Sequence, residues 1–268
     1  MKNTIKFWGA HRWKLCAIAL AAVIGFAMIA CDADKKTDEG GKKWLGTGSL
    51  TITNEQVYTV KQTVTNYVYE KYAGSDKLTS TGGSGDITSG KLTYTVSVPT
   101  DANLESLEGD EGYSWFTNWD KVKIEPKTVK TFLFEGAETA SDKYVSKSED
   151  KTKISGSSVS GSTESVMYVY VNADVKITGE GKTDTDQDEE GKYTITTKNL
   201  SLSLKKGWNA VTLKDTISGT MSDVKFTTSI SVNNPNLKWT LSEYDDDYDE
   251  DYSWSIPSFN RLRQNIDN

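Results

Sequence analysis

The side chains of this chain that could do chemistry are carboxylates and aromatic rings, because the usual nucleophiles and metal ligands are nearly absent. The only histidine is His11, and the only cysteines are Cys16 and Cys31. The chain beyond Cys31 therefore has no Ser-His-Asp triad, no Cys-His nucleophile, no ordinary zinc site and no disulfide framework. Carboxylate chemistry, calcium ligation and binding by aromatic surfaces remain.

The stretch Asp101–Asp120 (DANLESLEGDEGYSWFTNWD) places acids beside a cluster of aromatic residues. Flat rings next to carboxylates suit sugars, through CH–π stacking and hydrogen bonds to hydroxyl groups. The candidate ligand-binding residues are Tyr113, Trp115, Trp119 and Asp120. The alternative is that these aromatic side chains cap one end of the core, as most large aromatic residues do.

A second acidic stretch has acids at every other position. Asp184, Asp186 and Asp188 resemble the first half of a calcium-binding loop, because alternating oxygen ligands suit a hard cation. The EF-hand pattern then fails, since Glu189 stands where glycine is needed and Ile195 where the bidentate glutamate belongs. These three aspartates are the candidate metal ligands, and calcium is the only cofactor suggested. The alternative is a solvated hairpin tip.

The end of the chain forms a third candidate segment. Residues Glu243–Tyr252 (EYDDDYDEDY) hold seven acids and three tyrosines, so the run repels itself and predicts a disordered acidic tail over 243–268. It could attract a basic partner or loose cations. The following SIPSFNRLRQNIDN predicts one short helix that begins at Ser258, which would serve as its N-cap.

Residues 1–30 are predicted to be a secretory signal peptide. Four basic residues within the first 14 positions precede an apolar run from Leu15 to Ile29, and no acid occurs before Asp32. The alternative is a retained transmembrane helix, but the run is shorter than the roughly 20 apolar residues that span a bilayer. Without this leader, 27 basic and 38 acidic residues remain, a net charge of −11. Such an acidic body argues against nucleic acid as a partner.

The sequence MIAC at Met28–Cys31 resembles a bacterial lipobox, in which Cys31 takes a diacylglycerol and signal peptidase II cuts between Ala30 and Cys31. MKNTIKFWG followed by ALAAVIGFAMIAC resembles the leader of treponeme lipoproteins, with AHRWKLC inserted. The resemblance implies a palmitate-type lipid anchor outside the cytoplasm, on the outer membrane or cell surface or on a periplasmic face. Since each buried methylene contributes about 0.8 kcal/mol, two or three acyl chains would hold the protein firmly.

The body carries further resemblance to uncharacterised treponeme lipoproteins. The matching segments are GTGSLTITN at 46–54, LSLKKGWN at 202–209 and PNLKW at 235–239. The middle of the body has no such match. The resemblance implies a β-rich fold and an envelope location, and it implies no activity.

The chain from Trp44 to Leu241 predicts strands and turns, with no ten-residue stretch of helical periodicity. Apolar residues alternate over 92–98, 169–177 and 224–232, which predicts half-buried strands. The 169–177 stretch is expected to be a single strand, 74–90 a loop, and Lys205–Gly207 a tight hairpin. A bulge or turn near Lys198–Asn199 is needed to absorb a slip in the alternation.

The predicted fold is therefore all-β, an antiparallel β-sandwich or barrel-like sandwich over 44–242. It follows a signal helix at 1–30 and a flexible tether at 31–43, and the acidic tail at 243–268 comes after it. The alternative is two smaller sheets that meet at a candidate subdomain boundary in the polar stretch 136–162.

These observations favour a lipid-anchored envelope protein whose body is a binding or adhesion module for a glycan, an envelope component or a host molecule. One alternative is an enzyme that acts on glycosidic bonds with two carboxylates. No motif singles out a catalytic carboxylate, so an enzyme is not the favoured prediction. A purely structural envelope lipoprotein is the other alternative.

Overall fold

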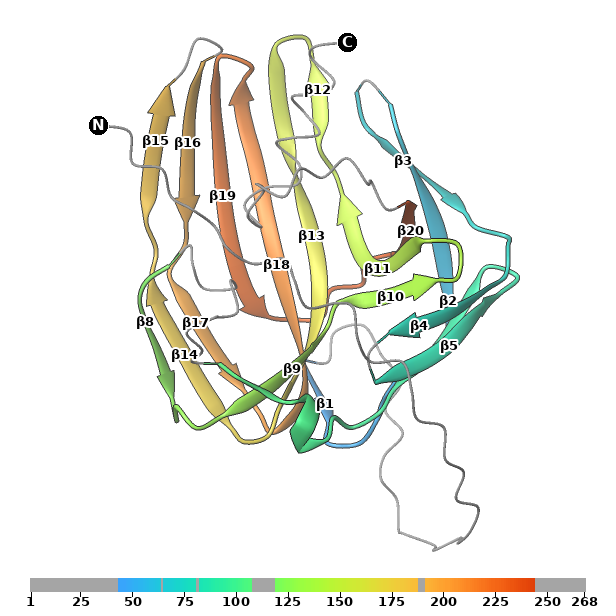
Figure 1. The fold of residues 1–268 in the computed structure, drawn as a ribbon. Helices are drawn as coiled ribbons and strands as arrows, with labels where there is room; N and C mark the ends of the chain where they lie inside the picture. The colour runs from blue at the N-terminus through green and yellow to red at the C-terminus, as the bar shows by residue number, and fades with distance from the viewer. Residues whose placement is uncertain (1–42, 64, 81, 108–118, 188–190, 244–268) are drawn as a thin grey trace, which may run out of the picture.

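The computed structural model describes residues 43–63, 65–80, 82–107, 119–187 and 191–243. Within these ranges the chain forms twenty strands and one 3₁₀ helix, and the predicted all-β class is confirmed (Figure 1). The strands build a 17-stranded sheet and a separate three-stranded sheet. The predicted leader, the predicted lipidation site and the predicted tail beyond Glu243 lie outside the described residues.

Seven strands of the large sheet close into a barrel, which lies on the right in Figure 1. Each strand pairs with the next, and the last returns to the first through a parallel register from Val57↔Trp239 to Thr59↔Leu241. In spatial order they are β2 (Leu50–Gln62), β6 (Lys91–Val96), β5 (Gly83–Thr88), β4 (Asp76–Ser80), β10 (Gly136–Thr139), β11 (Lys143–Asp150) and β20 (Trp239–Glu243). Strand β3 (Tyr67–Lys71) pairs with β2 outside this ring.

The other half of the large sheet is an open, twisted array on the left in Figure 1. It consists of β13 (Ser158–Val171), β18 (Gly207–Thr220), β19 (Asp223–Val232), β16 (Lys192–Thr197) and β15 (Thr183–Gln187). Strand β11 pairs with both β20 and β13, so this array is continuous with the barrel. Shorter elements flank it: β1 (Trp44–Gly46), β7 (Glu105–Ser106), β9 (Lys130–Phe134), β12 (Lys153–Ser155) and the 3₁₀ helix η1 (Asp101–Asn103).

The three-stranded sheet covers part of the open array and completes a sandwich. It orders β17 (Leu200–Leu204), β14 (Val175–Glu180) and β8 (Asp120–Glu125). Its inward side chains, such as Ile124, Ile177 and Leu202, pack with Val169 and Val211 of the open array. The predicted sandwich and the predicted barrel are therefore both present, one at each end of a single long sheet.

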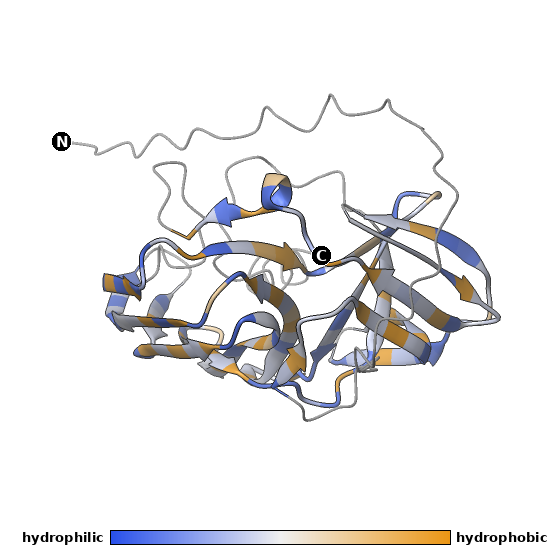
Figure 2. Ribbon diagram, turned by 90° about the horizontal axis from the view of Figure 1, so that it is seen from below, coloured by the Kyte–Doolittle hydropathy of each residue, from blue (hydrophilic) through white to orange (hydrophobic). Residues whose placement is uncertain are grey.

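Two separate hydrophobic cores result, and we call them the first core and the second core. The first core includes the buried residues of the barrel strands and extends onto β13 and β18 through Tyr168 and Trp208. The second core lies in the sandwich and contains Met167 and Val169. Successive residues of β13 thus point into different cores, as the pleat of a strand requires. Figure 2 shows the matching alternation of hydrophobic and hydrophilic residues along many strands.

The prediction of one strand over 169–177 is wrong. Strand β13 ends at Val171, and β14 begins at Val175 in the other sheet. The alternation of apolar residues continues across the connection because both strands face the second core from opposite sides. The slip at Lys198–Asn199 has the same cause, since β16 belongs to the large sheet and β17 to the three-stranded sheet.

The hairpin predicted at Lys205–Gly207 is also a passage between sheets, because β17 and β18 do not pair. Gly207 has φ +101°, and a Cβ there would lie 2.2 Å from the carbonyl oxygen of Gly46. Glycine is needed for this close approach of two backbones.

Two segments predicted as polar connections contain strands instead. Residues 74–90 include β4 and β5, and residues 136–162 include β10, β11, β12 and the start of β13. The polar stretch 136–162 therefore carries the chain from the barrel into the open array. Its proposed role as a subdomain boundary stays a prediction.

Candidate ligand-binding site

A cleft of about 480 Å³ lies at the point where β5 begins and β6 ends, next to η1. This volume falls within the usual range of small-molecule sites, about 300–1,000 Å³. We call it the barrel cleft, and it is lined by Gly82, Gly83, Ser84, Thr95, Ser97, Val98, Pro99, Thr100, Asn103 and Phe132.

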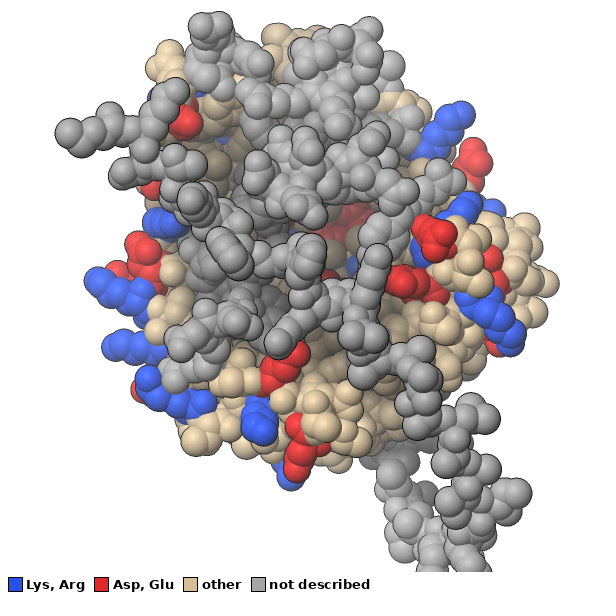
Figure 3. Space-filling model, in the orientation of Figure 1, with Lys and Arg blue, Asp and Glu red and all other residues tan. Residues whose placement is uncertain are grey.

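None of these lining residues is ionisable, although the whole chain carries 31 basic and 38 acidic residues. The polar groups are the hydroxyls of Ser84, Thr95, Ser97 and Thr100 and the amide of Asn103. Elsewhere on the surface, acidic and basic side chains are interspersed around the rim of the face drawn in Figure 3. The barrel cleft is thus an uncharged site on a charged protein.

The pairing of β5 with β6 positions the hydroxyl side of the cleft. Ser84 lies directly opposite Thr95 in the register, so their side chains share one face of the sheet. The backbone N–H of Ser97 donates to the carbonyl oxygen of Gly82 at 2.8 Å, which extends the ladder beyond β6. Ser84 and Thr95 are therefore held on paired strands, and Ser97 lies one residue beyond β6.

Glycines allow this part of the barrel to close around Tyr94. A Cβ on Gly83 would lie 2.7 Å from Cε1 of the Tyr94 ring, and a Cβ on Gly85 would lie 2.7 Å from its Cδ2. The ring is 1% exposed and stacks on Phe134 with centroids 5.5 Å apart. Burial raises the pKa of the Tyr94 phenol, while the hydrogen bond with Ser80 opposes that rise.

The aromatic wall of the cleft is Phe132 on β9. Its ring meets Trp208 edge to face, with centroids 6.1 Å apart. The adjacent pair Glu105↔Thr131 joins β7 to β9 and brings η1 beside this ring. The partly buried Phe132 side chain therefore packs against the first core and also contributes an apolar surface to the cleft.

The 3₁₀ helix supplies the one amide group. The Thr100 hydroxyl donates to Oδ1 of Asn103 at 2.6 Å. Among the described residues, Nδ2 of Asn103 has no hydrogen-bond partner, so a donor remains for a ligand oxygen. Leu104 follows η1 and is buried in the first core, which anchors the helix.

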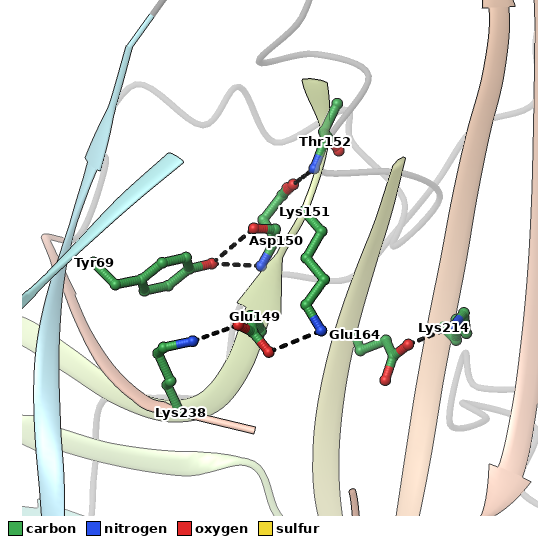
Figure 4. Close-up of polar contacts among 8 residues, drawn as sticks. All are labelled: Tyr69, Glu149, Asp150, Lys151, Thr152, Glu164, Lys214 and Lys238. Atoms are coloured by element: carbon green, nitrogen blue, oxygen red, sulfur yellow. Dashed lines mark hydrogen bonds and ion pairs between the residues drawn. The ribbon is translucent and has the colours of Figure 1, made fainter. Parts of the chain in front are cut away.

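A second group of polar side chains lies between β3, β11, β13 and β18, and Figure 4 shows it. Glu149 accepts hydrogen bonds from Lys238 and, at 3.1 Å, from Lys151. Glu164 accepts one from Lys214 at 2.5 Å. We call these five residues the charged network.

Tyr69 joins the charged network to β3. Its hydroxyl accepts the backbone N–H of Asp150 at 2.5 Å and donates to the carbonyl oxygen of Asp150 at 3.1 Å. The Lys238 ammonium lies 4.7 Å from the centre of the Tyr69 ring, a cation–π distance. These contacts tie β3 to β11, two strands that do not pair.

The charged network contains the most obvious carboxylate pair, because Glu149 and Glu164 lie opposite each other across β11 and β13. Burial alone would raise the pKa of Glu149, but the hydrogen bonds and charges of Lys238 and Lys151 outweigh it and lower the pKa. A general acid at neutral pH needs a raised pKa. Glu149 is therefore suited to an ion pair rather than to proton donation.

Two other carboxyl groups have raised pKa values. Burial raises the pKa of Glu135 to about 7, and burial raises that of Asp215 despite a hydrogen bond from Thr228. Phe134, next to Glu135, pairs with Tyr168, whereas Asp215 pairs with Thr163. One further step along this register places Glu135 level with Met167, four residues from Thr163. The two carboxyl groups are therefore about 13 Å apart along β13, at roughly 3.3 Å per residue, beyond the reach of a glycosidase pair.

The structure places the predicted aromatic site only in part, since Tyr113 and Trp115 lie outside the described residues. Trp119 is 6% exposed, belongs to the second core, and donates its indole N–H to the carbonyl oxygen of Lys198 at 2.6 Å. Its ring is therefore mostly buried, and the binding role suggested for it stays a prediction. Asp120 is exposed at the start of β8.

The predicted calcium ligands lie on a strand. Asp184 and Asp186 share one exposed face of β15, and Asp188 is outside the described residues. Asp184 lies 3.8 Å from the Lys182 ammonium, and Asp186 accepts the backbone N–H of Gln187. The described ranges contain no group of three or more histidine, cysteine, aspartate or glutamate residues arranged to hold a metal ion.

Within the described ranges, no helix is long and apolar enough to cross a membrane. The predicted lipidation residue Cys31 and the predicted cleavage position between Ala30 and Cys31 lie outside those ranges. Comparisons of the chain with protein-family models, with curated proteins and with solved structures found no match.

Sequence reasoning missed the barrel cleft. Its residues come from three separate stretches, 82–84, 95–103 and 132, which only the strand pairing brings together. The one local signal was Gly82-Gly83 directly before a Ser/Thr-rich stretch, which we interpreted as a loop.

Proposed function

We propose that this chain is a lipid-anchored protein of the cell envelope whose β body binds an uncharged, hydroxyl-rich ligand, such as a segment of a neutral glycan, in the barrel cleft. The observation that carries this proposal is the lining itself, which offers four hydroxyl residues, one amide and one phenylalanine ring but no charge. Sugar recognition uses the same combination of polar groups that fix orientation and an apolar surface.

The anchor rests on the leader and on Cys31. A tether of twelve residues after the cysteine, 32–43, would hold the body off the lipid surface. Labelling of growing cells with a palmitate analogue should mark the wild-type protein and not Cys31→Ser. Protease treatment of intact cells, with a periplasmic protein as control, would then distinguish the cell surface from a periplasmic face.

Ligand binding can be tested by blocking the cleft. The purified lipoprotein should bind members of a panel of neutral oligosaccharides in calorimetric titrations, and Thr95→Trp should weaken that binding at least tenfold. Thr93→Trp is the matched control, because Thr93 is exposed on the same face of β6 but does not line the cleft. Equal affinity of both variants would reject the cleft as the site.

The same panel separates binding from catalysis. Hydrolysis of a bound oligosaccharide would favour the enzyme alternative, whereas binding without turnover supports a binding module. Binding restricted to acidic oligosaccharides would also contradict the proposal, because the cleft has no cation to receive them.

A further inference from the structure

The barrel cleft has more apolar surface than one sugar ring can cover. Its apolar residues are Val98, Pro99 and Phe132, and Val98 is one of five large hydrophobic side chains that the described part of the chain exposes. Pro99 has no backbone N–H to offer a ligand. The CH face of a sugar ring can cover the flat Phe132 side chain. Val98 and Pro99 then leave room for a second, smaller apolar group, because a hydroxyl placed on them would lose its hydrogen bonds to water.

The amide of Asn103, which follows this apolar stretch, is held in one orientation. Its Oδ1 accepts the Thr100 hydroxyl at 2.6 Å, and its backbone N–H donates to the carbonyl oxygen of Thr100 at 2.9 Å. The next residue, Leu104, is buried in the first core. Since Oδ1 already accepts a hydrogen bond, the group that Asn103 offers to a ligand is the Nδ2 donor.

This donor differs in kind from the hydroxyl groups of the cleft, because a hydroxyl both donates and accepts whereas Nδ2 only donates. A donor of that kind is complementary to a carbonyl oxygen, which only accepts. A sugar hydroxyl could also accept, but it would then need a partner for its own proton. A carboxylate oxygen is a poor match, because none of the lining residues carries a charge to balance it.

The acetamido group of an N-acetylated sugar meets these requirements and is itself neutral. Its carbonyl oxygen can accept from Asn103, and its methyl group can lie against Val98 and Pro99. In a trans amide the N–H points away from the carbonyl oxygen. The N–H therefore remains available to a hydroxyl of Ser84 or Thr95, the pair held by the register of β5 and β6.

We propose that the barrel cleft selects neutral oligosaccharides that carry N-acetyl groups, and that Asn103 determines this specificity by donating to the acetamido carbonyl. The inference rests on the proposed function, because it names the class of neutral glycan that the cleft takes.

Two matched trisaccharides test the selectivity. Fully N-acetylated chitotriose and cellotriose share one type of linkage and differ in whether each ring carries an acetamido or a hydroxyl group. In calorimetric titrations, the purified full-length protein should bind the N-acetylated trisaccharide at least tenfold more tightly than cellotriose.

A variant of Asn103 tests the residue. Asn103→Leu keeps the approximate size of the side chain and removes the donor, so its affinities for the two trisaccharides should lie within threefold of each other. Asp101→Leu is the matched control, because Asp101 is exposed on the same 3₁₀ helix and does not line the cleft. It should keep the full preference of the wild type. Equal urea midpoints of both variants and the wild type would show that all three are folded.

The outcomes separate this inference from the proposed function. Equal affinity of the wild type for both trisaccharides, or a preference retained in Asn103→Leu, would overturn the inference and leave the cleft as a site for neutral glycans. The same holds if neither trisaccharide binds but another neutral oligosaccharide without an acetamido group does. If no neutral oligosaccharide binds, or if the preference survives Thr95→Trp with unchanged affinity, both proposals fail.

Discussion

The barrel and the sandwich share one sheet, but their cores are built from different kinds of side chain. The first core contains six aromatic residues, and their rings stack or meet edge to face, as do Tyr168 with Trp239 and Tyr170 with Trp208. Among the described residues, the buried side chains of the second core are aliphatic apart from Met167 and Trp119. A closed barrel has a wide interior that large rings fill, whereas two sheets about 10 Å apart leave room for valine, isoleucine and leucine.

This difference in composition indicates which substitutions should destabilise each core most. The barrel depends on a few large side chains, and the sandwich depends on many small ones. Strands β13 and β18 supply residues to both cores, so we expect the two regions to unfold together despite their different packing.

The largest effect is expected at Trp208, which is fully buried between Phe132 and Tyr170. Trp208→Ala should lower the free energy of unfolding by about 4 kcal/mol, through lost burial and the cavity it leaves. Urea denaturation followed by far-UV and near-UV circular dichroism measures this loss. Separate transitions by the two probes would show that the barrel unfolds on its own.

A conservative change at the same position serves as the control. The indole N–H of Trp208 is buried without a hydrogen-bond partner. Trp208→Phe should therefore cost about 1 kcal/mol, because it removes an unsatisfied polar group along with some volume. If Trp208→Phe lowered the free energy of unfolding as much as Trp208→Ala, the volume of the indole ring would contribute more to stability than we infer.

Ile177 offers the corresponding test of the sandwich, since it is fully buried in the second core. Ile177→Ala should cost about 3 kcal/mol and shift the same single transition in the urea experiment. If part of the far-UV signal of the strands were lost while the near-UV signal of the aromatic rings persisted, the sandwich would open while the aromatic barrel remains folded.

The junction from β9 to β10 should respond to pH through Glu135. Its folded pKa of about 7 is above the ordinary value of 4.5, and burial is the cause. The ionised form destabilises the folded state, so this cost grows as pH rises from about 4.5 to above 7. Glu135→Gln should therefore raise the free energy of unfolding at pH 8.5 by about 2 kcal/mol.

The same substitution should have little effect at pH 4, where the carboxyl is protonated in both states. Urea denaturation of both proteins at the two pH values supplies the measurement. A variant that is no more stable than the wild type at pH 8.5 would contradict the assigned burial.

At the junction from β11 to β13, ionisation of Glu149 should stabilise the fold, which is the opposite of the effect at Glu135, and the change in the free energy of unfolding should be smaller. The lysines around Glu149 hold its pKa below the ordinary value, so it stabilises the fold above pH 4.5. That contribution is lost as pH falls through the lowered pKa. Glu149→Gln should cost about 1 kcal/mol at pH 7, measured by urea denaturation against Glu138→Gln, an exposed control on β10.

The sequence predicted the class of fold and many of its strands, because half-buried strands alternate visibly. Leu92, Tyr94 and Val96 of β6 are buried, as their alternation predicts. The passage from β13 to β14 was missed because Val171 and Val175 face one core from opposite sheets, so the alternation does not register the change of sheet.

The strands in 74–90 were missed for a different reason. Gly83 and Gly85 are glycines because the Tyr94 ring occupies the space of a side chain, yet glycine in a sequence ordinarily indicates a turn. The barrel cleft was missed for the same reason, since three of its lining residues, Gly82, Gly83 and Ser84, come from this stretch. In the sequence, a glycine that long-range packing requires thus looks the same as a glycine that marks a local turn.

The parallel pairing of β2 with β20 has a consequence for how the protein is made. The ring is completed only when Val57 meets Trp239, so a chain that emerges from its N-terminus holds an unfinished barrel until its last strand arrives. Such non-local closure is slow, and unpaired strand edges invite association during the delay. The part of the body already synthesised would therefore depend on protection from neighbouring chains until nearly the whole sequence had been made.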